Sequence, residues 1–223
     1  MKAFAFVLLC ALAAVQGRHT GLQSTSSAAA LGENPWLVHL RIAVSTSGLL
    51  ETCAGSLIGN QWVLTAASCV ADSRFIWVRY GVVNVINPSL VTENSLVRIH
   101  PDYNLASGEN NIALININRL VESTENIEPI GIGESSDAGK FCAFGGPDGP
   151  GEILNCYDVE VSKDEDGALS VSSDEVEVTR YDVGAALVSD GAQVGVLVDD
   201  SGNFIATAKY ADWLKQETGL DFA

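Results

Sequence analysis

Apolar and polar residues of this chain alternate over short distances, which is the pattern of half-buried β-strands. Residues 157–162, Tyr-Asp-Val-Glu-Val-Ser, place apolar side chains on one face of a strand and polar side chains on the other. The acidic run that follows at 163–167, KDEDG, predicts a hairpin turn rather than a calcium loop, which would need more ligands at regular spacing. Further runs rich in Val and Ile, separated by Gly, Asn, Asp and Ser, lie at 36–44, 56–59, 62–66, 75–86, 95–99, 112–118, 156–162, 168–172, 175–179, 185–190, 192–199 and 204–208. Together they predict an all-β sandwich or barrel.

Only the end of the chain has the period of a helix. Tyr210, Trp213 and Leu214 fall on one face of residues 209–218 at three- and four-residue spacing. Gly219 follows, where a helix commonly ends. We therefore expect a single helix after the strands.

The stretch 62–70, WVLTAASCV, raises the question of what Ser68 does. Its apolar, β-branched start predicts a strand that runs into a short helical turn closed by Cys69. A serine in that turn could be a nucleophile, a helix cap or a replacement for another residue. The choice decides whether the protein is an enzyme.

Residues 1–17, MKAFAFVLLCALAAVQG, have the layout of a secretory signal peptide. A lysine stands near the start, an apolar run spans 3–15 and small residues precede the expected cleavage after Gly17. The apolar run is shorter than the roughly 20 residues that a membrane span needs. We therefore expect a secreted protein that starts at Arg18.

Cleavage of the signal peptide removes Cys10 and leaves four cysteines, Cys53, Cys69, Cys142 and Cys156. An even number in an exported chain predicts two disulfides, and four cysteines permit three pairings. Zinc is the alternative, but there is no CxxC motif and the three histidines are far apart in the chain. Neither a metal nor another cofactor is expected.

The excess of acidic residues limits the kinds of partner that the protein can bind. The chain has 28 acidic and 12 basic residues and a net charge of −16. Such a charge repels phosphate groups, which argues against nucleic acid and anionic membrane surfaces. We interpret the acidity as a source of solubility in extracellular fluid rather than as a patch for a basic partner.

Six segments, in order and at suitable intervals, resemble the chymotrypsin-like (trypsin-type) serine proteases. They are GENPWLVHL (32–40), CAGSLIGNQWVLTAASC (53–69), VRIHPDYN (97–104), NNIALININ (110–118), YDVGAALVSDGAQVGVLV (181–198) and YADWL (210–214). The resemblance implies two antiparallel six-stranded β-barrels with a C-terminal helix and an active site in the cleft between them. We expect one domain over 18–223, with the first barrel at about 30–122 and the second at about 123–223.

The resemblance also answers the question about Ser68. The family has TAAHC where this chain has TAASC, so Ser68 stands at the position of the catalytic histidine. Asn111 replaces the aspartate of the family's DIAL motif, and Val183 replaces the nucleophilic serine of GDSGGPL. A triad needs a nucleophile, a base and an acid that orients the base. The resemblance thus implies a catalytically inactive homologue with no catalytic residue.

The surroundings of these positions also depart from the family. Tyr181 stands where a glycine N–H helps to bind the oxyanion, and Asp199 and Asp200 stand on the edge that pairs with a peptide substrate. The family's activation start falls at residues 23–26 with no basic residue just before it. Asp182 is thereby left without its usual ammonium partner, and we expect it to lie in water.

The resemblance selects one disulfide pairing. It implies a bond between Cys53 and Cys69. Ser189 stands where the family has the cysteine that pairs with the counterpart of Cys142, so Cys142 is expected to pair with Cys156.

The leading hypothesis is a secreted, non-catalytic serine protease homologue that binds an extracellular protein: a protease, an inhibitor or another partner. One alternative is a weak hydrolase with rearranged catalytic groups. Another is an abundant extracellular storage or structural protein on the same fold. Among the four tryptophans, only Trp77 is expected to be a surface anchor for a partner. The oligomeric state is not predicted.

Overall fold

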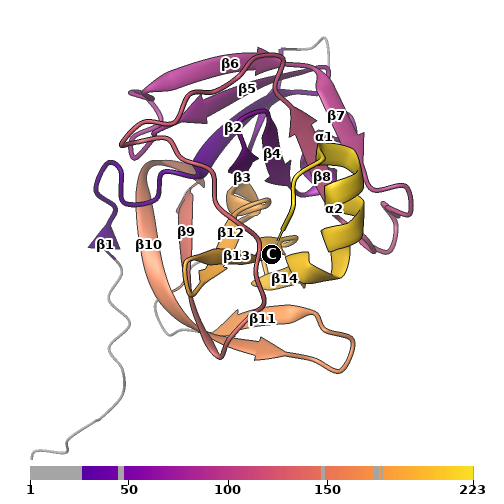
Figure 1. Cartoon of the computed structure of the whole chain (residues 1–223). Helices are drawn as coiled ribbons and strands as arrows, with labels where there is room; N and C mark the ends of the chain where they lie inside the picture. Colours follow the sequence, from indigo (N-terminus) through magenta and orange to yellow (C-terminus); the bar gives the residue numbers. More distant parts are fainter. Residues whose placement is uncertain (1–26, 45–47, 147–148, 173–175, 177, 223) are drawn as a thin grey trace, which may run out of the picture.

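The computed structural model describes residues 27–44, 48–146, 149–172, 176 and 178–222, and the strands form two curled antiparallel sheets (Figure 1). The expected signal peptide, the start at Arg18 and the activation segment at 23–26 lie outside the described residues. The first sheet occupies the first half of the chain. The second contains the later strands and one short early strand.

The first sheet has the order β6-β5-β2-β3-β4-β8-β7. Its strands are β2 (Leu37–Ala43), β3 (Leu50–Gly59), β4 (Trp62–Thr65), β5 (Phe75–Tyr80), β6 (Leu90–Asn94), β7 (Leu96–Ile99) and β8 (Ala113–Asn116). The edge strands β6 and β7 are two parts of one stretch separated only by Ser95. Because β6 pairs with β5 and β7 pairs with β8, this stretch closes the sheet into a barrel.

The second sheet has the order β1-β10-β11-β14-β13-β12-β9. Its strands are β1 (Ser27–Ala28), β9 (Ala138–Gly146), β10 (Gly149–Lys163), β11 (Leu169–Ser172), β12 (Ala186–Ser189), β13 (Ala192–Leu197) and β14 (Asn203–Ala206). An additional pairing of β10 with β9 closes this sheet, and β1 adds to its outside. With β1 set aside and the split stretch counted once, each barrel has the six strands that the family resemblance implied.

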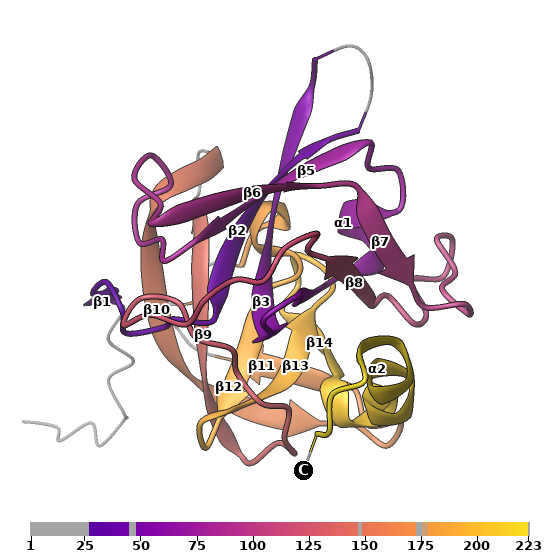
Figure 2. The ribbon, with the colours of Figure 1, turned by 45° about the horizontal axis from the view of Figure 1, so that its top comes forward.

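The helices are short. The first, α1 (Ala67–Val70), follows β4 directly, as the stretch 62–70 predicted. The 3₁₀ turns are η1 (Arg180–Asp182) and η2 (Thr207–Tyr210). The C-terminal helix α2 (Ala211–Thr218) ends at Gly219, which has the left-handed φ of 71° typical of a helix C-terminus. Buried Leu214 packs this helix into the core of the first barrel, and Figures 1 and 2 both place α2 beside β7 and β8.

The predicted buried and exposed faces of the strand at 157–162 were correct. Tyr157, Val159 and Val161 are buried, whereas Asp158, Glu160 and Ser162 are exposed. The KDEDG run does form the hairpin turn between β10 and β11, in which the Asp164 carboxylate accepts a hydrogen bond of 2.8 Å from the Ala168 N–H.

Other strand predictions were wrong. The strand expected over 75–86 ends at Tyr80, because Gly81 turns the chain with a left-handed φ of 54°. The strand expected at 175–179 is absent at its described residues 176, 178 and 179, and its other residues lie outside the description. Strand β9 was not predicted at all, since its three glycines obscure the apolar pattern.

Candidate functional site

The first candidate residue, Ser68, lies in α1, where the chain is tied to the neighbouring strand β3. The Thr65 hydroxyl donates a hydrogen bond of 2.8 Å to the Ala54 carbonyl, and a disulfide joins Cys53 to Cys69. These two links fix the turn that carries Ser68. The side chain of Ser68 itself is exposed.

Asn111 meets Ser68 from the chain segment just before β8. The Ser68 N–H donates to Asn111 Oδ1 at 2.8 Å, and Asn111 Nδ2 donates to Ser68 Oγ at 3.1 Å. The same amide group lies 3.5 Å from the Val198 carbonyl oxygen. Asn111 is buried, so these contacts satisfy its polar atoms. Neither an amide nor an alcohol accepts a proton near pH 7, so this pair is no general base.

Val183 belongs to the second half of the chain and lies at the junction between the two barrels, beside the segment that carries Ser68. Its carbonyl oxygen accepts a hydrogen bond of 2.9 Å from the Ala54 N–H and lies 3.5 Å from Cys69 Sγ. Its side chain packs against the core of the first barrel. The next residue, Gly184, has a φ of 90°, and a Cβ there would lie 2.2 Å from the Ala54 carbonyl oxygen. Glycine is therefore required at 184, and the turn brings Val183 to the segment that carries Ser68.

Tyr181 is held within the turn η1. Thr179 caps this turn, and its hydroxyl oxygen accepts a hydrogen bond of 3.3 Å from the Tyr181 N–H. The Arg180 guanidinium donates to the Tyr181 hydroxyl at 2.8 Å and lies 4.8 Å from the centre of its ring. The backbone N–H at position 181 thus already has an internal acceptor.

Asp182, expected in water, is completely buried. Its carboxylate accepts hydrogen bonds from the Phe144 N–H at 3.0 Å, the Gly145 N–H at 2.7 Å and the Thr179 N–H at 3.0 Å. The Thr179 hydroxyl adds a fourth at 2.7 Å. We call these four donors the Asp182 cradle. Burial raises the pKa of Asp182, and the hydrogen bonds act in the opposite direction. The expectation was wrong because donors of the fold replace both water and an ammonium partner.

Part of this cradle was readable in the sequence. Thr179 and Asp182 form a Thr-x-x-Asp capping box, in which each side chain bonds to the other's backbone N–H. Phe144 and Gly145 belong to β9, which is distant in the sequence, and no sequence pattern there indicated that their N–H groups would bind Asp182. Position 145 must also be glycine, because a Cβ there would lie 2.0 Å from Thr179 Oγ1.

The two acids expected on the peptide-pairing edge behave differently. The Asp199 carboxylate turns back into its own loop and accepts hydrogen bonds from the Ser201 N–H at 2.9 Å and from Asn203 Nδ2 at 2.8 Å. Asp200 is exposed. Only Asp200 therefore presents a carboxylate that this loop does not already use.

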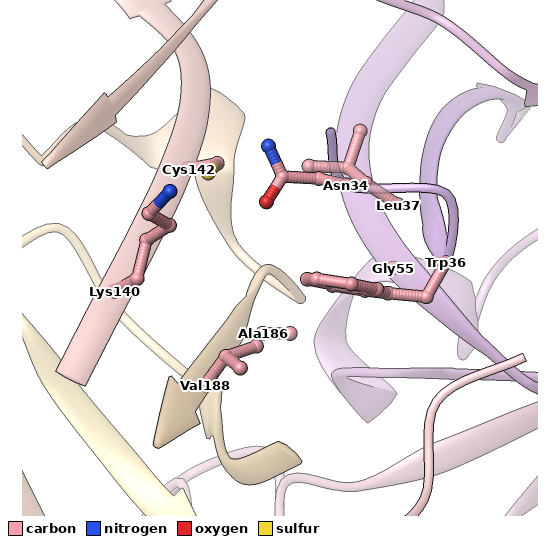
Figure 3. Close-up of a pocket in the computed structure, with 8 residues that line it drawn as sticks. All are labelled: Asn34, Trp36, Leu37, Gly55, Lys140, Cys142, Ala186 and Val188. Atoms are coloured by element: carbon pink, nitrogen blue, oxygen red, sulfur yellow. The ribbon is translucent and has the colours of Figure 1, made fainter. Parts of the chain in front are cut away.

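An open cleft of about 610 Å³ lies beside Ser68. It is lined by Val44, Glu51, Ser68, Cys69, Asp72 and Arg74. A second cavity, between the barrels near Cys142, holds only about 10 Å³, and Figure 3 shows Trp36 and Lys140 at its sides. That is space for about one water molecule. The cleft beside Ser68 is thus the larger space at the candidate site.

The disulfide expectations were confirmed. Cys53 is bonded to Cys69, and Cys142 is bonded to Cys156. Ser189 is at the position of the absent family cysteine. Its hydroxyl donates a hydrogen bond of 2.7 Å to the Ala138 carbonyl and lies 2.6 Å from the Ser136 hydroxyl.

Among the described residues there is no group of three or more His, Cys, Asp and Glu side chains that could hold a metal ion. No helix within the described ranges is long and apolar enough to cross a membrane.

The comparisons with known proteins agree with this architecture. The family model described as Trypsin matches residues 24–213. Trypsin II-P29 of Gallus gallus is 27% identical over 205 residues, which cover 78% of this chain and 82% of that protein. Serine protease 28 of Mus musculus is 33% identical over 110 residues, 47% of this chain, and the match spans only 40% of the mouse protein.

Two solved structures have the same fold. HL collagenase matches with a TM-score of 0.79 and 27% identity over 87% of this chain and 98% of that one. GrC matches with a TM-score of 0.78 and 20% identity over 87% and 99%. Since the family model covers most of the chain and both barrels are present, the chain belongs to the trypsin family of chymotrypsin-like serine proteases.

Proposed function

We propose that this protein is a secreted, non-catalytic member of the trypsin family that acts by binding an extracellular protein. The observation that carries the proposal is Val183. A valine at the nucleophile position has no hydroxyl to attack a carbonyl, and its side chain packs against the core. Two disulfides support secretion, because such bonds persist in oxidising compartments.

The neighbours of Val183 support the same proposal. Ser68 and Asn111 bond to each other, and neither can take a proton at neutral pH. The two described histidines are engaged elsewhere: the His39 ring contacts Phe144, and the His100 ring contacts Tyr210. Loss of a triad costs about a millionfold in turnover, which is roughly 8 kcal/mol of barrier.

Binding is favoured over a purely structural role because the cleft beside Ser68 is open. Its lining includes Glu51, Asp72 and Arg74, whose charged side chains suit a polar protein surface better than an apolar ligand. The partner belongs to one of three classes: a protease, an inhibitor or another extracellular protein.

A serine-directed fluorophosphonate tests the absence of a nucleophile. We expect no covalent labelling of the purified full-length protein under conditions that label active trypsin to completion. Stoichiometric labelling at Ser68 or any other serine would instead support the weak hydrolase with rearranged groups.

A pull-down tests the binding role. The tagged protein is incubated with extracellular fluid from its source, and bound proteins are identified by mass spectrometry. We expect saturable capture of one partner, weakened by Asp72→Lys in the cleft and unchanged by Asp137→Lys, an exposed acid outside it. Very high abundance of the protein without capture would favour the storage or structural role.

A further inference from the structure

A groove on the outside of the first barrel carries two arginines that form no ion pair with a described acidic residue. It has a volume of about 720 Å³ and is lined by Arg41, Leu50, Trp77, Arg79, Val85, Ile86, Pro88, Val91 and Glu152. None of these residues lines the cleft beside Ser68. The groove is therefore a separate surface, and its use does not depend on the catalytic state of the protein.

Strand register explains how the floor of the groove forms. In the pairing of β2 with β5, Arg41 is opposite Trp77 and His39 is opposite Arg79. These residues share the outer face of the sheet, since Val38, Leu40 and Ile42 point into the core. Arg41 and Arg79 are thus diagonal neighbours across the two strands, and Trp77 lies directly opposite Arg41 on the same face.

The walls of the groove come from two other segments. The loop between β5 and β6 supplies Val85 and Ile86, and the loop is attached to β10 by a hydrogen bond of 2.9 Å from the Val85 N–H to the Glu152 carbonyl. Leu50 stands on the opposite rim, at the start of β3. Leu50, Ile86 and Val91 expose 39%, 64% and 42% of their surface, which makes the rim apolar.

The positive charge of the floor is not neutralised within the described chain. The ion pairs among the described residues join Arg98 to Glu217, Lys140 to Glu33 and Lys215 to Asp221. Among the described residues no carboxylate lies within 4.0 Å of the Arg41 or Arg79 guanidinium, although the sequence has 28 acidic residues. Two acids are close to the groove. Glu93 accepts a hydrogen bond of 3.1 Å from the Trp77 indole, and Glu152 lines one wall.

The charges of these arginines also act on His39, a buried residue on the same face of the sheet. The pKa of His39 is lowered to about 4, first by burial and then by the charges of Arg79 and Arg41. The pKa of Arg79 is also lowered, by burial and by the charge of Arg41. The two guanidinium charges at the floor of the groove therefore act on each other, and a bound anionic group would offset their repulsion.

We propose that this groove binds an acidic peptide segment of a partner protein, one whose carboxylates meet Arg41 and Arg79 and whose apolar side chain packs on Trp77 and the rim. Guanidinium groups bind carboxylates through paired, charge-assisted hydrogen bonds. The apolar rim favours a peptide over a sulfated polysaccharide, which has no apolar side chains to bury. A short segment also experiences less repulsion from this acidic chain than a long polyanion does.

The test uses a fluorescent peptide of about eight residues in which Glu and Leu alternate, titrated with the full-length protein at about 20 mM and about 150 mM salt. We expect saturable binding that weakens at the higher salt concentration. Arg41→Gln and Arg79→Gln should each reduce the affinity at least about tenfold. The matched control Arg98→Gln, which removes the same charge from β7, should leave the affinity within about twofold. Near-ultraviolet circular dichroism checks that each variant is folded.

Four outcomes would overturn the proposal. The first is equal affinity for a peptide in which Gln replaces Glu, and the second is unchanged binding in both groove variants. Tighter binding of a heparin fragment than of the peptide would assign the groove to a polysaccharide. Self-association that both groove variants abolish, without peptide binding, would assign it to a second copy of this chain.

Discussion

At the junction between the two barrels, the side chains of the first barrel and those of the second are held in place in different ways. On the first-barrel side, Ser68 and Asn111 lie within hydrogen-bonding distance as neutral groups. On the second-barrel side, the buried carboxylate of Asp182 is surrounded by four donors.

The difference shows what positions a side chain in each region. The first pair is placed by the scaffold, through the Cys53–Cys69 disulfide and the strand before Ser68, so its position does not depend on a charge. The turn around Asp182 is organised by the carboxylate itself, because the Thr179 cap and two N–H groups of β9 all bond to it. Mutations should therefore perturb the two sides unequally.

The largest effect is expected for Asp182→Ala. This change leaves the Phe144 and Gly145 N–H groups and the Thr179 donors without an acceptor in a dry site, where unpaired polar groups are costly. We expect the free energy of unfolding to fall by about 4 kcal/mol, measured by urea denaturation. The exposed Asp137→Ala serves as control and should change stability by less than about 0.5 kcal/mol. Equal effects of both changes would remove the distinction between the two sides.

A second, smaller effect should appear as pH dependence at the back of the Asp182 cradle. The ring of Phe144, whose N–H belongs to the cradle, lies 5.3 Å from the buried ring of His39. The pKa of His39 is lowered to about 4 from 6.5, so the unfolded chain binds a proton more tightly than the folded one. Stability from this group is complete above pH 6.5 and is lost as pH falls toward 4.

We expect this loss to be about 2 kcal/mol between pH 6.5 and 5. The change His39→Leu should flatten the stability profile in that window, whereas His100→Asn, at a more exposed ring, should flatten it less. Urea denaturation at each pH provides the measurement. If His39→Leu leaves the slope as it is, His39 is not the titrating group.

The smallest effect is expected on the first-barrel side. Asn111→Ala removes buried hydrogen bonds to Ser68 and should lower the free energy of unfolding by about 1 kcal/mol. Ser68→Ala, at an exposed position, should lower it by less than about 0.5 kcal/mol. A greater loss for Ser68→Ala than for Asn111→Ala would mean that the serine, rather than the amide, organises this side.

The reversal of all three substitutions would sharpen the same comparison. In Ser68→His/Asn111→Asp/Val183→Ser, the first-barrel side should accept its new residues, because the scaffold already brings these positions together. The second side should not support turnover, since the Tyr181 N–H is directed at Thr179. We expect ester hydrolysis more than about a hundredfold below that of an active trypsin. Activity within a hundredfold would show that the scaffold is still competent for catalysis and that the loss is confined to the three triad positions.

Patterns in the amino-acid sequence were enough to predict the all-β class and the C-terminal helix. Through the family resemblance they also predicted the disulfide pairing and the closeness of Ser68, Asn111 and Val183. These features depend on local alternation, on a glycine that ends a helix and on motifs of a few residues. The Thr-x-x-Asp pattern of the capping box at Thr179 and Asp182 is also local, but it was not among the predictions.

The environment of Asp182 and the groove on the first barrel could be seen only in the folded chain. The donors of Phe144 and Gly145 belong to a strand whose glycines obscure its pattern, and backbone N–H groups carry no sequence signature. Arg41 and Arg79 become neighbours through antiparallel register, which no local period reveals. Local patterns determine which face of a strand is buried, but the burial and potential of a charge depend on segments brought together from distant parts of the chain.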